Sequence, residues 1–221
     1  MKQAGTVLAV GAGTGLLPGQ QATAAESHGK LKVLAFSGSR RLGKTTAASL
    51  KLVLDSIREA DANIETELIE LANYQLFGYG LKGADLPADD FDLLATKIRE
   101  PNVAGLVFGT PSYFGSLSSL MKIFIERLMA FRKDLELKNK IAGAIAVGGA
   151  RNGGQERCLE QIWTTLSSQQ VIFAQDAPPT AHWGGTLWNQ NDSIDADEFG
   201  QNTAKNLGKR IAELARLCAN R

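Results

Sequence analysis

The sequence has 221 residues, enough for one well-buried α/β domain. Its 24 Lys and Arg residues nearly cancel its 23 Asp and Glu residues, so the charge balance gives no reason to expect nucleic acid or an anionic membrane as a partner. The two cysteines, Cys158 and Cys218, stand far apart outside any C-x-x-C pattern and indicate neither a zinc site nor a disulfide framework.

Residues 1–30 differ in character from the rest of the chain. A short apolar stretch rich in Ala and Gly is followed by Pro18 and a run of small polar residues. The stretch is too short and too rich in glycine for a membrane-spanning helix. It is similar to the apolar and cleavage regions of an export signal, with Ala22-Thr23-Ala24 as the cleavage site. We therefore predict a leader over 1–30, with export favoured over a disordered leader on a cytoplasmic protein, and one domain over 31–221.

From Leu31 onward, short apolar runs alternate with longer segments whose apolar residues recur at helical spacing. The expected strands are 31–36, 63–71, 103–110, 140–149 and 170–175, and the expected helices are 45–60, 90–100, 116–131, 154–169 and 195–220. Repeated strand–helix units predict an α/β domain with a parallel sheet and helices on both faces. Ligands of such sheets bind outside the carboxyl ends of the strands. Three chemically unusual loops follow predicted strands at that edge, over 37–46, 109–116 and 148–156.

The first of these loops contains an unbroken G-x-x-x-x-G-K-T from Gly38 to Thr45, the pattern of a nucleotide phosphate loop. It leads from a strand into a helix, whose free N–H groups favour an anion. The side chains expected to assist are Ser37, Ser39, Arg41, Lys44, Thr45 and Thr46. An NTPase also needs an acidic residue after a second buried strand to hold Mg²⁺, and neither "GLVFGTP" nor "GAIAVGG" ends in one. A P-loop NTPase that uses Gly38–Thr45 stays open as an alternative.

The second and third loops suggest a site for a flat ring. "GTPSYFG" places Tyr113 and Phe114 side by side directly after a buried strand, where two aromatic rings can form walls beside a heterocycle. "GGARNGGQE" has four glycines, which let the backbone approach a ligand closely. Arg151 and Asn152 in this loop are candidates for contacts with a ring edge or a second substrate.

Together the three loops resemble those of the flavodoxin-like NAD(P)H-dependent FMN reductase family, in particular its iron–sulfur flavoprotein and NAD(P)H:quinone reductase branches. "SGSRRLGKTT" is similar to the family's FMN-phosphate loop, G-S-P-R-x-x-G-N-T. "GTPSYFGSLSSLMKIFIER" is similar to its segment G-[ST]-P-x-Y-[FW]-G…K-x-F-[ILF]-[DE]-R, and "GGARNGGQE" to its G-G…G-G-Q-E loop. The resemblance runs from about residue 31 to the C-terminal helix.

The resemblance implies a flavodoxin-like three-layer sandwich, with a parallel five-stranded sheet of order 2-1-3-4-5 that binds FMN non-covalently. The residues implied to hold the FMN phosphate are Ser39, Arg41, Thr45 and Thr46. Those implied to line the isoalloxazine ring are Pro111, Ser112, Tyr113, Phe114 and Gly115. The other side of the ring would be closed by Gly148, Gly149, Arg151, Gly153 and Gly154.

The chain departs from the family pattern in three places. Arg40 replaces the usual proline, and the Gly43-Lys44 pair shifts the glycine by one, which creates the likeness to a triphosphate loop. The cysteine cluster of iron–sulfur flavoproteins is missing, so no cluster and no metal site are predicted. Asn152 stands where several relatives carry a histidine near the substrate. His182 and Trp183 are further candidates for substrate contacts, over a flavin of the same or a neighbouring subunit.

The implied function is an FMN-dependent oxidoreductase that passes electrons from NAD(P)H through FMN to a quinone or similar acceptor, as a homodimer or homotetramer. The flavin supplies the redox chemistry, so no side chain is assigned as a general acid or base. Two alternatives remain besides this one. They are a flavodoxin-type electron carrier without NAD(P)H activity, and the P-loop NTPase.

Overall fold

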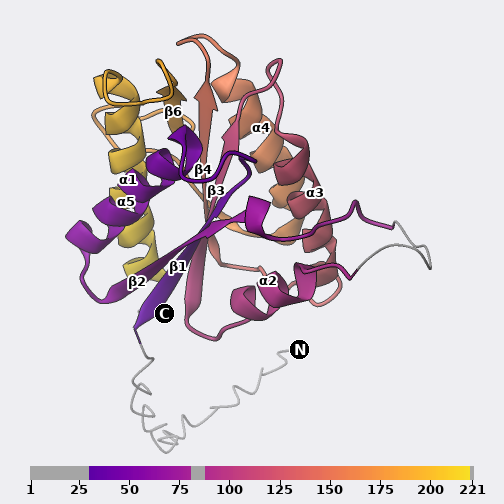
Figure 1. Cartoon of the computed structure of the whole chain (residues 1–221). Coiled ribbons are helices and arrows are strands. Elements are labelled where there is room, and N and C mark those ends of the chain that lie inside the picture. Colours follow the sequence, from indigo (N-terminus) through magenta and orange to yellow (C-terminus); the bar gives the residue numbers. More distant parts are fainter. Residues whose placement is uncertain (1–29, 81–87, 220–221) are drawn as a thin grey trace, which may run out of the picture.

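The computed structural model describes residues 30–80 and 88–219, which form a sheet between two layers of helices (Figure 1). The strands are β1 (Leu31–Ser37), β2 (Ile64–Glu70), β3 (Val103–Pro111), β4 (Ile141–Gly148), β5 (Ile172–Ala174) and β6 (Gly185–Trp188). The helices are α1 (Thr45–Ala60), α2 (Phe91–Ile98), α3 (Ser119–Arg127), α4 (Gln155–Leu166) and α5 (Glu198–Ala219). The predicted export signal lies outside the described residues.

The sheet is parallel and has the order β2-β1-β3-β4-β5, which confirms the expected 2-1-3-4-5 arrangement. Two short strands share the fifth position. β5 pairs with the first part of β4, over Ile141–Gly143, and β6 pairs with the second part, over Ile145–Gly148. The segment between them contains Pro178 and Pro179, which lack the N–H donors that a continuous strand would need.

Helices α2, α3 and α4 cover one face of the sheet, and α1 and α5 cover the other (Figure 1). Aromatic side chains fill the core under α2 and α3: the rings of Phe36 and Phe124 lie 4.6 Å apart, and Phe108 packs beside both. These three side chains are fully buried, and each contributes on the order of 2 kcal/mol to folding. The central strands are therefore held rigidly, which positions the loops at their ends.

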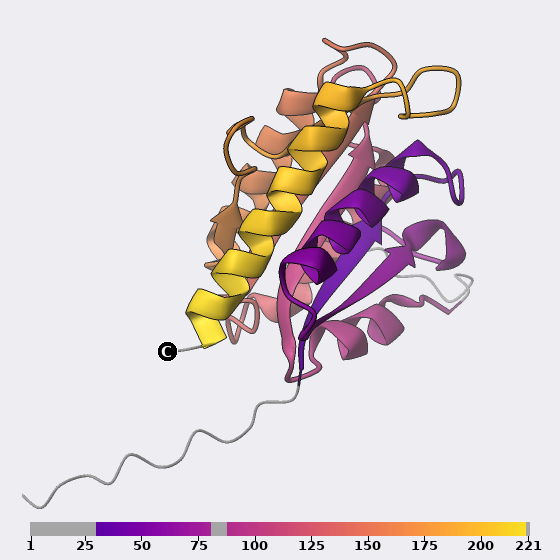
Figure 2. The ribbon, with the colours of Figure 1, turned by 90° about the vertical axis from the view of Figure 1, so that its left-hand side faces the viewer.

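Helices α1 and α5 lie side by side on the opposite face (Figure 2). A Cβ atom added at Gly208 of α5 would lie 2.5 Å from the carbonyl oxygen of Val53, so only glycine permits this approach. Ser56 uses the proximity to donate a hydrogen bond of 2.7 Å to the carbonyl oxygen of Lys205. These contacts join the second half of α1 to the first half of α5. Both helices begin after the carboxyl end of a strand, α1 after β1 and α5 after β6.

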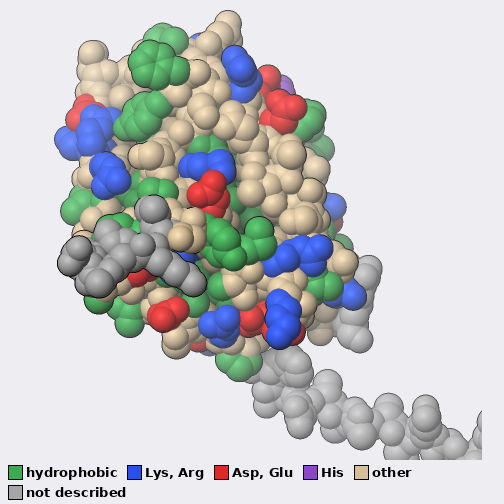
Figure 3. All heavy atoms as spheres, turned by 90° about the vertical axis from the view of Figure 1, so that its right-hand side faces the viewer, with side chains coloured by type: hydrophobic (Ala, Val, Ile, Leu, Met, Phe, Trp, Pro, Cys, Tyr) green, Lys and Arg blue, Asp and Glu red, His purple; other side chains and the backbone are tan. Residues whose placement is uncertain are grey.

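The surface over α3 and α4 carries charged side chains of both signs, interspersed with apolar ones (Figure 3). Among the described residues, no helix is both long enough and apolar enough to cross a bilayer.

Candidate functional site

Loop 1, residues 38–44, connects β1 to the N-terminus of α1. Helix α1 begins at Thr45, and Lys44 caps it without a side-chain hydrogen bond, so the first N–H groups of the helix point to the loop without a side-chain partner. The N–H group of Gly38 donates to the carbonyl oxygen of Gly109 over 2.7 Å. A Cβ atom at Gly38 would lie 2.6 Å from Met121 Cβ, so this turn requires glycine. The geometry matches helix N-termini that bind phosphate.

The hydroxyl groups predicted for this site surround the same turn. Ser39, Thr45 and Thr46 are all buried, and Ser39 Oγ accepts a hydrogen bond of 3.1 Å from the N–H of Arg41. Ser37 Oγ is fully buried and has no hydrogen-bond partner within the described part of the chain. A buried hydroxyl without a partner is costly, and an oxygen-rich ligand would relieve that cost.

Two of the three basic side chains of loop 1 form ion pairs with one residue far along the chain. Arg41 and Lys44 both pair with Asp192, with a Lys44 Nζ to Asp192 Oδ2 distance of 2.9 Å. The Lys44 ammonium and the Arg41 guanidinium hold the pKa of the Asp192 carboxyl below its usual range. Sequence reasoning missed Asp192, because no local pattern links it to a loop 151 positions away.

Loop 2, residues 112–118, connects β3 to α3 and is hydrogen-bonded to loop 1. Ser118 caps α3 by accepting from the N–H of Met121 over 3.1 Å, and its Oγ donates to the carbonyl oxygen of Gly38 over 2.7 Å. The N–H of Ser118 donates in turn to Thr110 Oγ1 over 3.1 Å. The two loops therefore hold a fixed relative position.

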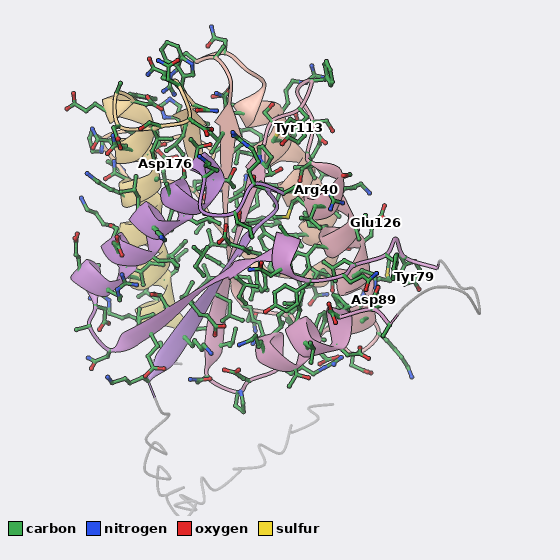
Figure 4. All side chains as sticks on the ribbon, in the orientation of Figure 1. Arg40, Tyr79, Asp89, Tyr113, Glu126 and Asp176 are labelled. Carbon is green, nitrogen blue, oxygen red and sulfur yellow. The ribbon has the colours of Figure 1, made fainter. Side chains whose placement is uncertain are left out.

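The tip of loop 2 is a tight turn that presents two aromatic rings. Tyr113 and Ser116 exchange backbone hydrogen bonds of 3.0 Å, and Phe114 and Gly115 between them have φ angles of +54° and +71°. Phe114 is fully exposed and Tyr113 is half exposed, so neither ring folds back onto the core. Figure 4 shows Tyr113, Arg40 of loop 1 and Asp176 toward the same end of the molecule.

Loop 3, residues 149–154, connects β4 to α4 and touches loop 2. Ser112 Oγ donates to the carbonyl oxygen of Gly153 over 2.6 Å. Gly154 has a φ of +85°, and a Cβ atom added there would lie 2.5 Å from the Cα of Gly115. Gly149 has no atom within 4 Å of an added Cβ. Gly148, at the end of β4, packs under Gln155. The structure thus brings loops 1, 2 and 3 to one edge, as the sequence predicts.

Arg151 turns away from loops 1 and 2. Its guanidinium donates to the carbonyl oxygen of Thr186 over 3.0 Å, pairs with Asp197 and lies 5.6 Å from the ring centre of Phe199. Its partners are therefore on β6 and near the start of α5. Asn152 and His182 line a pocket of about 380 Å³ on this side of loop 3. Trp183 is exposed and does not line that pocket.

Two carboxylates close to strand ends, Glu70 after β2 and Asp176 after β5, accept hydrogen bonds from backbone N–H groups. Glu70, at the end of β2, accepts a hydrogen bond of 2.7 Å from the N–H of Gly43, a group that a triphosphate loop needs for its ligand. Asp176 accepts from the N–H groups of His182 and Gly184. Within residues 30–80 and 88–219, no group of three or more His, Cys, Asp or Glu side chains is arranged to hold a metal.

The two cysteines do not fit an iron–sulfur cluster, which is held by four thiolates in its common forms. Cys158 is buried in the first turn of α4, and burial raises the pKa of its thiol, so it stays protonated. Cys218 lies in the last turn of α5, at the other end of the molecule.

Comparison with known proteins gives relatives over most of the chain. Residues 31–179 match the family described as NADPH-dependent FMN reductase. An iron–sulfur flavoprotein of Methanocaldococcus jannaschii is 37% identical over 194 residues, which cover 85% of this chain and 98% of that protein. An iron–sulfur flavoprotein of Methanosarcina thermophila is 27% identical over 194 residues, which cover 85% of this chain and 96% of that protein.

Solved structures share the fold at low sequence identity. RosB, in complex with 8-demethyl-8-formylriboflavin-5'-phosphate, aligns with a TM-score of 0.65 and 19% identity over 85% of this chain and 79% of its own. An NADH:FMN oxidoreductase aligns with a TM-score of 0.55 and 18% identity over 86% of this chain and 89% of its own. These structures support the flavodoxin-like architecture. With the match over residues 31–179, they lead to one conclusion: the chain belongs to the NADPH-dependent FMN reductase family.

Proposed function

We propose that this flavin oxidoreductase binds FMN across loops 1, 2 and 3 and passes electrons from NAD(P)H through it to a quinone or similar acceptor. The observation that carries the proposal is the hydrogen-bonded junction of the three loops, in which Ser118 ties loop 2 to loop 1 and Ser112 ties it to loop 3. An anion site at one end and two exposed aromatic rings at the other suit a cofactor with a phosphate and a flat ring.

The phosphate end would be held by loop 1 and the start of α1. The hydroxyls of Ser39, Thr45 and Thr46 are buried around the turn, and Ser37 Oγ lacks a partner among the described residues. Arg41 and Lys44 supply positive charge at its rim. No Mg²⁺ is needed to bind a single phosphate by helix N–H groups, hydroxyls and cations.

The ring end would be held by loops 2 and 3. When bound, FMN supplies the chemistry that accepts a hydride and passes electrons on. The chain's own residues bind it and set its orientation: Tyr113 and Phe114 offer ring faces, and Gly153 and Gly154 let the backbone come close. The N–H groups of Phe114 and Gly115 lie between the paired residues Tyr113 and Ser116, where they favour negative charge at a ring edge.

The second reactant would approach beside loop 3. Asn152 and His182 share a pocket there, which fits their predicted role as substrate contacts. Phe114 and Trp183 are large, exposed apolar side chains, and they support the proposed homodimer or homotetramer, in which another subunit would cover them.

A visible absorption spectrum of the purified protein is the first test, followed by mass identification of any small molecule released on denaturation. Two flavin bands and released FMN are expected, together with NAD(P)H oxidation that depends on an added quinone. Bound FMN without NAD(P)H oxidation would replace the proposal by an electron carrier. A colourless protein that fails to bind added FMN, and that hydrolyses ATP unless Lys44 is replaced by Ala, would replace it by the NTPase.

A further inference from the structure

A pocket lies beside loop 3, lined by residues of loop 3, α4, β6, α5 and the segment between β5 and β6. The pocket has a volume of about 380 Å³, within the range of sites for small molecules. Loop 3 and the first turn of α4 form one wall, and His182 and Phe199 form the opposite wall. Most of its lining residues belong to loop 3 and the start of α4, which follow the carboxyl end of β4, and α/β proteins bind their ligands at that edge of the sheet.

The α4 wall offers hydrogen-bond donors. Arg157 is exposed, and its guanidinium forms none of the ion pairs found over residues 30–80 and 88–219. A Cβ atom at Gly115 would lie 3.5 Å from Arg157 Nη1, so this guanidinium borders both the pocket and loop 2. Gly154 caps α4 without a side chain, and Asn152 adds an exposed amide. The acidic side chain in this wall is Glu156, which is also exposed.

The opposite wall is aromatic and ends in a histidine whose position is fixed. The rings of His182 and Phe199 meet edge to face, 5.7 Å apart. The carboxylate of Asp176 lies fully buried behind His182, and its Oδ1 accepts from the N–H groups of His182 over 2.7 Å and Gly184 over 3.1 Å. These two bonds hold the loop that carries the imidazole.

The other oxygen of Asp176 has no hydrogen-bond partner within the described part of the chain. It lies 3.9 Å from Nδ1 of His182, so a proton on that nitrogen, after a small ring rotation, would give Oδ2 the partner that it lacks. A histidine in this arrangement directs the N–H group of Nδ1 toward the carboxylate, and its Nε2 is left for a contact with another group.

We propose that this pocket binds a small planar ring compound that carries an ionised oxygen next to a carbonyl group, and that this compound is the electron acceptor. The aromatic wall of His182 and Phe199 suits a flat ring, and Arg157 with the start of α4 suits the oxygens. The acceptor role rests on the proposed function. A quinone of this class takes up two electrons and two protons to give the hydroquinone, and NAD(P)H with one proton from solvent supplies both.

Two probes with the same ring system test the ligand class: 2-hydroxy-1,4-naphthoquinone, which is ionised near neutral pH, and the uncharged 1,4-naphthoquinone. Isothermal titration calorimetry on the FMN-loaded protein should show about tenfold tighter binding of the hydroxy compound. Arg157→Ala and His182→Ala should each weaken its binding by roughly tenfold. Arg132→Ala is the matched control, since Arg132 is an exposed cation away from the pocket, and it should have no effect.

Equal affinities for the two probes would overturn the ligand class, and unchanged binding in both Arg157→Ala and His182→Ala would overturn the location. FMN content is measured in every variant, to show that the fold is intact. Titration of flavin-free protein separates the two proposals. If the protein binds no FMN and does not oxidise NAD(P)H, the proposed function and the acceptor role are both wrong. The effect of Arg157→Ala and His182→Ala on binding of the hydroxy compound still decides which ligand the pocket takes.

Discussion

The Nζ atom of Lys44 lies 2.9 Å from Oδ2 of Asp192, and Arg41 pairs with the other oxygen of the same carboxylate. The two cations at the rim of loop 1 thus already share an anionic partner from the loop that precedes α5. Asp192 itself has a φ of +66°, and backbone hydrogen bonds between Gln190 and Ser193 close the turn that carries it. Because the pKa of Asp192 is lowered, its charge persists well below neutral pH.

Asp192→Asn should tighten FMN binding by roughly threefold at low salt, because a carboxylate that competes with the phosphate for Arg41 and Lys44 is removed. Riboflavin lacks the phosphate, so its affinity should stay the same. Quenching of flavin fluorescence in titrations of both ligands measures the difference. Asp195→Asn, in the same loop, is the control. Weaker FMN binding by Asp192→Asn would show instead that Asp192 positions the cations for the phosphate.

Gly154→Ala should separate loops 2 and 3, because its Cβ would lie 2.5 Å from Gly115 Cα and its φ is +85°. We expect a loss of about 2 kcal/mol in the free energy of unfolding and a clear loss of FMN affinity. Gly149→Ala is the matched control, since an added Cβ there meets no atom within 4 Å. Thermal unfolding with and without FMN measures both effects. Equal behaviour of the two variants would argue against a required contact between these loops.

Phe114→Asn should stabilise the FMN-free protein by about 1 kcal/mol and weaken FMN binding. Phe114 has a φ of +54°, a backbone conformation that asparagine adopts at lower cost. Its ring is fully exposed, so no burial of the ring compensates for this backbone strain. Leu135 has a similar φ of +52° away from the three loops, and Leu135→Asn should leave FMN affinity unchanged. Urea unfolding and flavin titration give the two readouts. Unchanged FMN affinity in Phe114→Asn would remove this ring from the proposed site.

Asp89→Asn should destabilise the fold at about pH 7 by roughly 1 kcal/mol, and the loss should become smaller as the pH is lowered to about 3. Burial raises the pKa of the Asp89 carboxyl, but the N–H groups of Phe77 and Phe91 and the Arg127 guanidinium outweigh it and hold that pKa below its usual range. A lowered folded-state pKa stabilises the fold above the unfolded-state value, and this stabilisation is lost as the pH falls through the folded-state value.

Urea unfolding at the two pH values measures this difference for Asp89→Asn. Asp134→Asn is the control, because Asp134 is exposed and forms none of the ion pairs found among the described residues. An equal loss at both pH values would mean that the carboxylate charge of Asp89 is not the source of its effect. Figure 4 shows Asp89 on the α2–α3 side, away from Arg40 and Tyr113.

Most of the fold follows from periodicity in the sequence. The predicted strand 103–110 and helix 45–60 agree with β3 and α1 within a residue or so, because each is set by its own apolar pattern. Strand β6 was not predicted. It has four residues, one of them glycine, and its strand conformation depends on pairing with the second part of β4, which no local pattern contains.

The candidate site was likewise predictable only in part. The glycines and hydroxyls of loop 1 and the aromatic pair of loop 2 were predictable, because their chemistry is read from neighbouring positions. The direction of Arg151 was not, since Thr186 and Asp197 lie 35 and 46 positions later in the chain. Arg157 gave no signal either, as an exposed arginine on a helix is common. For Arg151, the long-range partners set the direction of the side chain.

The split between β5 and β6 also affects how the sheet meets other chains. β5 offers three residues and β6 four, with the excursion through Pro178 and Pro179 between them. A long, flat border strand presents a continuous row of unpaired N–H and C=O groups on which a foreign strand can assemble. The interruption leaves this border too short and discontinuous to act as such a template. The segment between β5 and β6, which also carries His182, therefore protects the molecule from strand addition and fibrillar association along this side.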